Sequence, residues 1–172
     1  MIRKAVMADL NQVEQGFVER LEYQQTHTAY TGWKLHVYPT RATAEQALSA
    51  GTLYVMEQEG EIAASMIASQ NQPAKFRDIP WRYPARDDEV LVLHLLCVRP
   101  SHARQGIGQA MVRHFMQEAR SLHCKTVRLD TGEPNTPAQA LYTKLGFECA
   151  GLRNHFLFFE RKVEVPRKIS PV

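Results

Sequence analysis

The sequence predicts an α/β protein, in which a twisted mixed sheet is flanked by helices on both sides. Strand-like and helix-like segments alternate along the chain, as is typical of this class. Residues 89–98 are almost continuously apolar, as expected for a central strand that is covered on both faces. The helix expected from Gly106 carries an apolar stripe at helical spacing. With 172 residues, of which 44% are hydrophobic, the chain suits one domain, expected over residues 1–163.

The first half of the chain alternates between short strand-like and helix-like patterns. The elements expected here are a strand at residues 2–6, a helix from Ala8 or Asp9, an irregular aromatic stretch at 23–40, a helix at 43–49 ended by Gly51, and a hairpin of residues 52–58 and 61–69. Residues 71–88 follow, with three prolines and three aromatic residues. A connection this long is usually functional or disordered, and its aromatic residues favour a packed flap. Whether this flap is a lid over a ligand is left open.

The second half of the chain has clearer boundaries. The stripe of the helix from Gly106 consists of Ile107, Met111, Phe115, Ala119 and Leu122. After it we expect a strand at residues 125–130, a helix with Thr136 and Gln139 as a capping box, Pro137 in its first turn and Gly146 at its end, strands at 147–150 and 155–163, and a loose tail at 164–172.

Composition excludes several classes of function. The net charge is only +3, from 21 basic and 18 acidic residues, which gives no case for nucleic-acid binding. No apolar run approaches eighteen residues and no signal peptide is recognisable, so we expect a cytoplasmic protein without a membrane segment. Cys97, Cys124 and Cys149 form no CxxC pair, and they are expected to be small buried hydrophobes. No histidine pairs with a cysteine or carboxylate at ligand spacing, so no metal is expected.

The turn between the apolar strand and the next helix has the features of an anion site. Gly106 and Gly108 allow the backbone to approach a ligand closely, and the amides at the start of a helix attract negative charge. A pyrophosphate is the expected ligand. Such a turn also serves tight packing or capping in many proteins. A dinucleotide fingerprint would need a third glycine, but Met111 stands at that position, so this alternative is disfavoured.

A second motif downstream strengthens the case for a ligand site. Residues 135–147 read NTPAQALYTKLGF. With ARQGIG at residues 103–108, this segment resembles the GNAT superfamily of N-acetyltransferases, whose signatures are [RQ]-x-x-G-x-[GA] and N-x-x-A-x-x-[LF]-Y-x-x-x-G-F. The second signature is met at Asn135, Ala138, Leu141, Tyr142, Gly146 and Phe147. The resemblance extends over residues 52–160. Ala103 departs from the family pattern, and the basic residue follows at Arg104.

The resemblance implies a GNAT-like acyl-CoA N-acyltransferase fold and acetyl-CoA as the cosubstrate, with no metal. The pantetheine would lie along the end of the central strand, against the main chain of Leu96, Cys97 and Val98. The pyrophosphate would meet the turn formed by Ala103, Arg104, Gln105, Gly106, Ile107, Gly108, Gln109 and Ala110. Asn135 would reach the cofactor from the second motif. Because the phosphate grip is mostly through main-chain amides, the Ala103 departure weakens the site without removing it.

Two residues are candidates for the proton transfers of acetyl transfer. Tyr142 stands at the family position of the general acid, although it also suits the inner face of its helix. His94 is the ionisable residue within the apolar strand, where alternation places it on one face with Val92, Leu96 and Val98. It is either the general base or a core histidine, and Glu89 and Asp130 are the substitutes for the base.

The acceptor is expected to be a primary amine of a small molecule or an amino acid, attacked directly in a ternary complex. Arg77, Arg82 and Arg86 favour an acceptor that also carries a carboxylate or phosphate. Two alternatives stay open: a protein or peptide N-acetyltransferase, and a non-catalytic acyl-CoA-binding module. Many relatives are dimers, so the resemblance also allows a homodimer.

Overall fold

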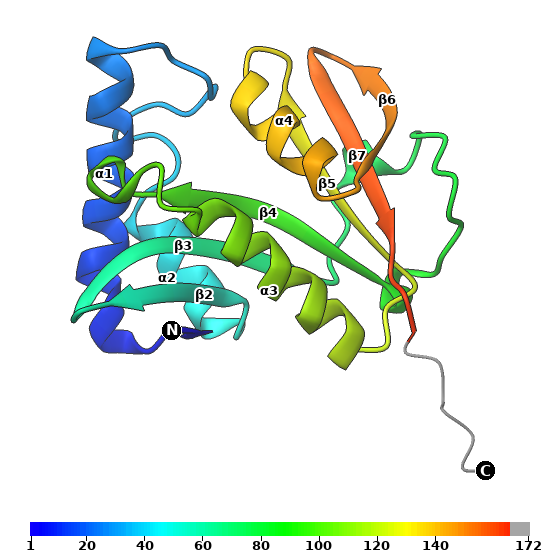
Figure 1. Ribbon diagram of the computed structural model, residues 1–172, viewed down its shortest axis with the longest axis horizontal. Helices are drawn as coiled ribbons and strands as arrows, with labels where there is room; N and C mark the ends of the chain where they lie inside the picture. Colours follow the sequence, from blue (N-terminus) through cyan, green and yellow to red (C-terminus); the bar gives the residue numbers. More distant parts are fainter. Residues whose placement is uncertain (166–172) are drawn as a thin grey trace.

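The computed structural model describes residues 1–165, so the tail expected at 164–172 lies almost entirely outside the described residues. Seven strands form one sheet in the order β1-β2-β3-β4-β5-β7-β6, and β4 is its middle strand, as the apolar run predicted (Figure 1). The strands are β1 (Ile2–Lys4), β2 (Leu53–Gln58), β3 (Glu61–Ser69), β4 (Val90–Val98), β5 (Thr126–Gly132), β6 (Glu148–Arg153) and β7 (Phe156–Lys162). Within the described chain β4 and β5 run parallel, and the other neighbouring strands are antiparallel. The sheet is therefore mixed.

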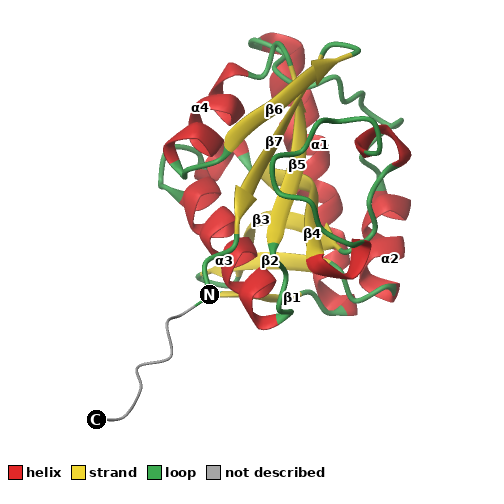
Figure 2. Ribbon diagram, turned by 90° about the vertical axis from the view of Figure 1, so that its right-hand side faces the viewer, coloured by secondary structure: helices red, strands yellow, loops and turns green. Residues whose placement is uncertain are grey.

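Helices cover both faces of the sheet, as predicted (Figure 2). The helices are α1 (Leu10–Thr26), α2 (Arg41–Ser49), α3 (Ile107–Ser121) and α4 (Thr136–Lys144). Helices α1 and α2 pack on one face around Phe17, and α3 packs on the other around Met111 and Phe115. Each helix buries its apolar stripe against the sheet, which supplies most of its stability. No helix in the described chain is long and apolar enough to cross a membrane.

Four local expectations need correction. Helix α1 continues to Thr26, so it includes the first four residues of the stretch expected to be irregular. Leu122 is 42% exposed because α3 ends at Ser121, so the core stripe stops at Ala119. Cys149 is exposed because its strand, β6, lies at the edge of the sheet. The N-cap of α4 is Asn135, so the predicted capping box of Thr136 and Gln139 is wrong.

A β-bulge at His94 changes which side chains of β4 face each layer. Leu93 pairs with Ala68 and Leu95 with the adjacent Ile67, so His94 is the extra residue of the ladder. Before the bulge Leu91 and Leu93 face the α3 core, whereas after it Leu96 and Val98 do so. The simple alternation that grouped Val92 with Leu96 and Val98 is therefore wrong, because one extra residue reverses the phase of the strand. Val92 instead packs with Phe76 and Phe158.

Residues 71–88 form a packed flap on the sheet, as their aromatic content predicted. Phe76 is buried against Phe158, and Trp81 packs on both. Two buried charged residues of the sheet, Arg128 and Glu160, bind the main chain of the flap. Nη2 of Arg128 donates to the Tyr83 carbonyl (3.0 Å), and Glu160 accepts from the amides of Arg82 (2.6 Å) and Tyr83 (3.3 Å). Buried charges without these partners would be costly, so the flap is held as a fixed part of the fold.

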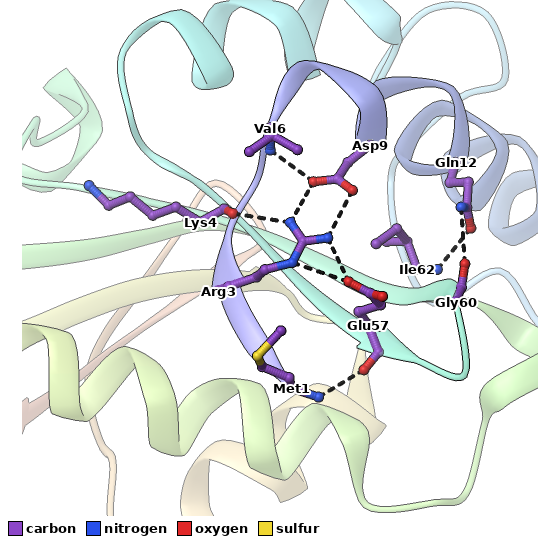
Figure 3. A network of polar contacts seen from close by, with 9 residues as sticks. All are labelled: Met1, Arg3, Lys4, Val6, Asp9, Gln12, Glu57, Gly60 and Ile62. Carbon is purple, nitrogen blue, oxygen red and sulfur yellow. Dashed lines mark hydrogen bonds and ion pairs between the residues drawn. The ribbon is translucent and has the colours of Figure 1, made fainter.

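An ion-pair cluster ties the edge strand β1 to β2 and to Asp9, the residue that precedes α1 (Figure 3). The Arg3 guanidinium makes two bonds to Asp9, at 2.7 and 3.0 Å, and two to Glu57, at 2.7 and 3.2 Å. Asp9 also accepts from the amide of Val6 (2.8 Å). The bond to Arg3 holds the pKa of the Asp9 carboxyl below its usual value. Since β1 is short and lies at an edge, this cluster fixes its position.

Replacing Arg3→Met should lower the free energy of unfolding by about 1–2 kcal/mol at neutral pH, because Asp9 then loses a bidentate partner. Because the pKa of Asp9 is depressed in the folded state, its contribution is present above the unfolded pKa and is lost as the pH falls. The difference from wild type should therefore shrink in acid. Urea unfolding at neutral and acidic pH measures both effects.

Arg41→Met is the matched control, since Arg41 pairs with Glu14 and Glu45 at the exposed surface. This variant should lose much less stability. A loss for Arg3→Met that equals the control, or that does not change with pH, would contradict the role given to the cluster.

Candidate active site

The site begins where β4 and β5 separate. The two strands pair only from Val90 to Leu93 and from Thr126 to Leu129, and beyond these residues they diverge (Figure 1). The bulge at His94 directly follows the last pair, so the strand turns away at the point where pairing ends. The space between the strands forms a cavity of about 640 Å³, lined by the ends of both strands and by residues of α1 and α4.

Beyond Leu93 the main chain of β4 has no strand partner on the side of this cavity, and there the Val98 carbonyl accepts from Arg20. The amide of Arg99 donates to Ala63 of β3, so the peptide groups of Cys97 also face β3 by alternation. Those of Leu96 and Val98 face the opposite side, toward the gap where β5 no longer pairs. Leu96 and Val98 line the cavity, whereas Cys97 does not. The side chain of Cys97 is buried against α1, and burial raises the pKa of its thiol to about 12, so it stays protonated.

The glycine turn before α3 presents a row of free amides. Arg104 and Gly106 both adopt left-handed backbone angles, with φ of 61° and 72°. In the described chain the amides of residues 104–109 donate no hydrogen bond, and the first helical bond runs from Ala110 to Gly106. Free amides at the start of a long helix form a concave site for an anion. The turn therefore has the free amides and the backbone conformation that the predicted anion site requires.

A second cavity of about 410 Å³ lies over this turn. Six of the predicted turn residues line it: Ala103, Arg104, Gly106, Ile107, Gly108 and Gln109. Gln105 and Ala110 do not. The two cavities share Arg20, Val98, Gly108, Pro137 and Leu141, so they adjoin, and the two together are called the cleft below.

Asn135 lines the larger cavity while it caps α4. Its Oδ1 accepts from the amide of Ala138 (3.3 Å), which satisfies one of the free donors at the start of the helix. Gln139 does not close a capping box, because its side-chain Nε2 donates to the main-chain carbonyls of Gly132 (3.2 Å) and Glu133 (2.8 Å). Asn135 thus caps α4, and the Gln139 side chain ties the helix to the end of β5.

Tyr142 is both a core residue and a cavity residue. Its side chain is 6% exposed and packs beside Phe147 and Phe159, yet it lines the larger cavity. Burial raises the pKa of its phenol, and the nearby charge of Asp130 raises it further. The hydroxyl therefore stays protonated and remains a hydrogen-bond donor at physiological pH.

His94 lines the same cavity from the bulge of β4. Its Nε2 lies 2.7 Å from the hydroxyl of Ser69, and burial lowers the pKa of the ring. The ring is therefore neutral near pH 7 and able to accept a proton. Of the two substitutes, Asp130 lines the cavity, where it pairs with Lys75 (2.5 Å). Glu89 lies at the opposite end of β4, paired with Lys125 and Arg86, and does not line either cavity.

The far wall of the larger cavity is aromatic. Tyr30, Trp33 and Tyr38, from the stretch between α1 and α2, line it together with Phe156 of β7. The three arginines of the flap region point elsewhere: Arg82 pairs with Glu148, Arg86 with Asp88 and Glu89, and Arg77 lies outside the lining. The cation that lines this wall is Lys75.

Sequence patterns did not reveal Arg20 or Lys75. Arg20 donates from Nε and Nη2 to the carbonyl of Val98, at 3.1 and 2.5 Å, across 78 positions of sequence. Lys75 reaches Asp130 across 55 positions. Both are charged residues in unremarkable polar surroundings, and neither belongs to a local motif. No group of three potential metal ligands comes together among the residues that the structure covers.

Comparisons with known proteins agree with this geometry. The model of the acetyltransferase (GNAT) family matches residues 11–147, which is most of the chain. The chain therefore belongs to the GNAT family of acetyltransferases. The family expectation made from the two motifs is confirmed.

The curated relatives are similar over parts of the chain. Human N-acetyltransferase 8 is 40% identical over 73 residues, which are 42% of this chain and 32% of that protein. The Escherichia coli [ribosomal protein bS18]-alanine N-acetyltransferase is 33% identical over 69 residues, 40% of this chain and 46% of the relative. An uncharacterized Bacillus subtilis protein, YdhI, is 26% identical over 130 residues, 75% of this chain and 71% of its own. The matches thus span from about a third to under three quarters of these relatives.

Solved structures share the fold over nearly the whole chain. A GNAT-family acetyltransferase from Streptococcus agalactiae has a TM-score of 0.82 at 19% identity, with 96% of each chain covered. The Escherichia coli ribosomal-protein-S18-alanine N-acetyltransferase has a TM-score of 0.68, also at 19% identity, and covers all of this chain and 99% of its own. At this identity the likeness supports the fold alone.

Proposed function

We propose that the protein transfers an acetyl group from acetyl-CoA to a primary amine of a small molecule or an amino acid, by direct attack in a ternary complex. The observation that carries this proposal is the pair of adjoining cavities, one over the free amides of residues 104–109 and the other in the gap between β4 and β5. One end would suit a pyrophosphate, and the other is lined by His94 and Tyr142, which would serve as proton acceptor and proton donor.

The cleft fits an extended pantetheine-type thioester. The amides of the glycine turn and the Arg20 guanidinium would bind the phosphates, where a helix start and a positive charge act together. The main-chain groups of Leu96 and the amide of Val98 would bond the pantetheine arm, as a neighbouring strand would, while the Val98 carbonyl holds Arg20. Cys97, Gln105 and Ala110, which the family resemblance also suggested, lie outside the lining and would act only by supporting their neighbours.

The chemistry follows from the two residues that face the gap. The amine nitrogen would attack the thioester carbonyl carbon, and the carbon–sulfur bond would break. Neutral His94 would take the proton that the amine loses, directly or through water. The phenol of Tyr142 would donate to the departing thiolate, which holds the negative charge. Bringing the two substrates together in one cleft would supply much of the rate enhancement.

The alternatives differ in what occupies the aromatic end of the cleft. A protein or peptide acceptor is suggested by the names of the ribosomal-protein-alanine relatives. The larger cavity has walls from α1, the flap and β7, and this enclosure favours a small molecule. A non-catalytic acyl-CoA-binding module is disfavoured by the presence of His94 and Tyr142 in the cleft. The domain limits at residues 1–163, the cytoplasmic location and a homodimer stay predictions.

Acetyl-CoA and CoA should each raise the melting temperature in a concentration-dependent way, because a ligand that binds only the folded state stabilises it. At about a hundred times the dissociation constant the stabilisation should be about 2.7 kcal/mol. NAD should cause no shift. Thermal unfolding with each ligand, followed by CoA release with an amine library, tests cosubstrate and acceptor. A shift with NAD and none with CoA would refute the proposal.

Gly108→Glu should abolish acetyl-CoA binding, because it places an anion beside the helix amides that would hold the pyrophosphate. Gly108→Ala is the matched control. Its Cβ would meet Leu141 Cδ2 at 3.4 Å, an ordinary contact, so binding should persist. Calorimetric titration of both variants, with circular dichroism to show folding, measures the effect. Unchanged affinity in a folded Gly108→Glu variant would show that the phosphates do not bind at this turn.

Tyr142→Phe and His94→Gln should affect different steps. The first removes only a proton donor, so kcat should fall by about 10²-fold with little change in the KM for acetyl-CoA. The second should remove the acidic limb of the pH profile of kcat/KM. In wild type this limb should lie below the pKa of an exposed histidine, because burial lowers the pKa of His94 and the protonated ring cannot accept a proton.

A His94→Gln variant that keeps the wild-type acidic limb would make His94 a core residue. The base would then be Asp130, Glu89 or solvent. Of the two carboxylates, Asp130 is the one that lines the cleft.

A further inference from the structure

Two opposite charges stand side by side at the acceptor end of the cleft. Lys75 Nζ lies 2.5 Å from Asp130 Oδ2, and both residues line the larger cavity. Asp130 is 14% exposed at its side chain and Lys75 is 48% exposed. The other cation of this lining, Arg20, is already bonded to the Val98 carbonyl near the glycine turn. The pair of Lys75 and Asp130 therefore sets the charge of the acceptor end.

The ion pair lines the same cavity as the two residues proposed for proton transfer, His94 and Tyr142. Asp130 begins the part of β5 that no longer pairs with β4, and its charge acts on both His94 and Tyr142. The ammonium of Lys75 lies 4.7 Å from the centre of the Phe156 ring, which holds it in the cavity wall by a cation–π contact. An amine placed for attack between His94 and Tyr142 would lie beside this ion pair.

Charge balance decides what kind of amine suits such a place. Primary amines arrive mostly as ammonium ions at neutral pH. A simple ammonium would share one carboxylate with Lys75, so two cations would lie together in a partly buried site, which is unfavourable. A zwitterion avoids this cost, because its ammonium pairs with Asp130 while its carboxylate pairs with Lys75. The Lys75 side chain is 48% exposed, so moving its ammonium from Asp130 to the carboxylate of the substrate exchanges one ion pair for another at a solvent-accessible position.

We infer that the acceptor is a free amino acid, whose ammonium group binds Asp130 and whose carboxylate binds Lys75. The inference rests on the proposed acetyltransferase function and adds the substrate class and two specificity-determining residues. It also locates the cation that the sequence had assigned to the arginines of residues 71–88, none of which lines the cleft. An amino group at the end of a peptide would lack the adjacent carboxylate.

The rest of the amino acid should be apolar. The wall next to the ion pair consists of Tyr30, Trp33, Tyr38 and Phe156. Trp33 and Tyr38 meet edge to face, with ring centres 6.4 Å apart, so this wall is a preformed aromatic surface. Burying an aliphatic or aromatic side chain against this surface is favourable, whereas a second charged group would find no partner on it.

The test compares each apolar amino acid with its decarboxylated amine, for example phenylalanine with phenethylamine and leucine with isopentylamine. The two members of a pair share the apolar body and differ by the carboxylate. In wild type the amino acid should have the higher kcat/KM. Lys75→Met should lower kcat/KM for the amino acid by about tenfold, since a charge-assisted bond is lost, and should raise it for the amine, since a repelling cation is removed.

Two variants serve as controls. Lys75→Arg keeps the cation and should restore the preference for the amino acid. Lys125→Met removes a lysine that pairs with Glu89 away from the cleft, and it should leave both substrates unaffected. General damage to the site would lower kcat/KM for both members of a pair, whereas the inference requires opposite directions.

The outcomes separate this inference from the proposed function. CoA release with simple amines or with an amidated peptide, but with no apolar amino acid, would overturn the inference and leave acetyl transfer standing. A Lys75→Met variant that changes both members of a pair by the same factor would overturn it as well. If neither CoA nor acetyl-CoA shifts the melting temperature and no acceptor releases CoA, the acetyltransferase proposal itself fails.

Discussion

The separation of β4 from β5 is the constraint on which the candidate active site depends. Parallel strands normally continue to pair until one of them ends, and here pairing stops at Leu93 although both strands go on. The extra residue at His94 reverses the phase of β4 and turns its free edge toward the gap. Unpaired peptide groups are costly in a dry interior, so an edge of this kind is stable only where water or a ligand reaches it.

The two halves of the sheet must be held firmly for this gap to keep its shape. On the β5 side, buried Arg128 and Glu160 fasten the flap of residues 71–88 to the sheet. On the β4 side, α1 packs across the sheet and sends Arg20 to the last carbonyl of β4. Since both walls are anchored by buried or charge-assisted contacts, the gap is preorganised, which is what binding and catalysis require.

The same flap explains why charge along the sequence was a poor guide to the acceptor. Three arginines stand at 77, 82 and 86, yet the fold commits Arg82 and Arg86 to surface carboxylates and turns Lys75 into the cleft. Solvated charges and site charges look alike in a sequence. Only the route of the flap across β5, fixed by Arg128 and Glu160, decides which cation meets Asp130.

The sequence alone determined the α/β class, the order of the elements, the central strand, the glycine turn and the family, because each depends on local periodicity, capping residues or a motif of fixed spacing. It also placed His94 and Tyr142 on elements that reach the cleft. Tertiary structure alone decided the bulge at His94, the parting of the strands and the contacts of Arg20 and Lys75. These features depend on pairing and packing between residues far apart in the chain, which local patterns do not record.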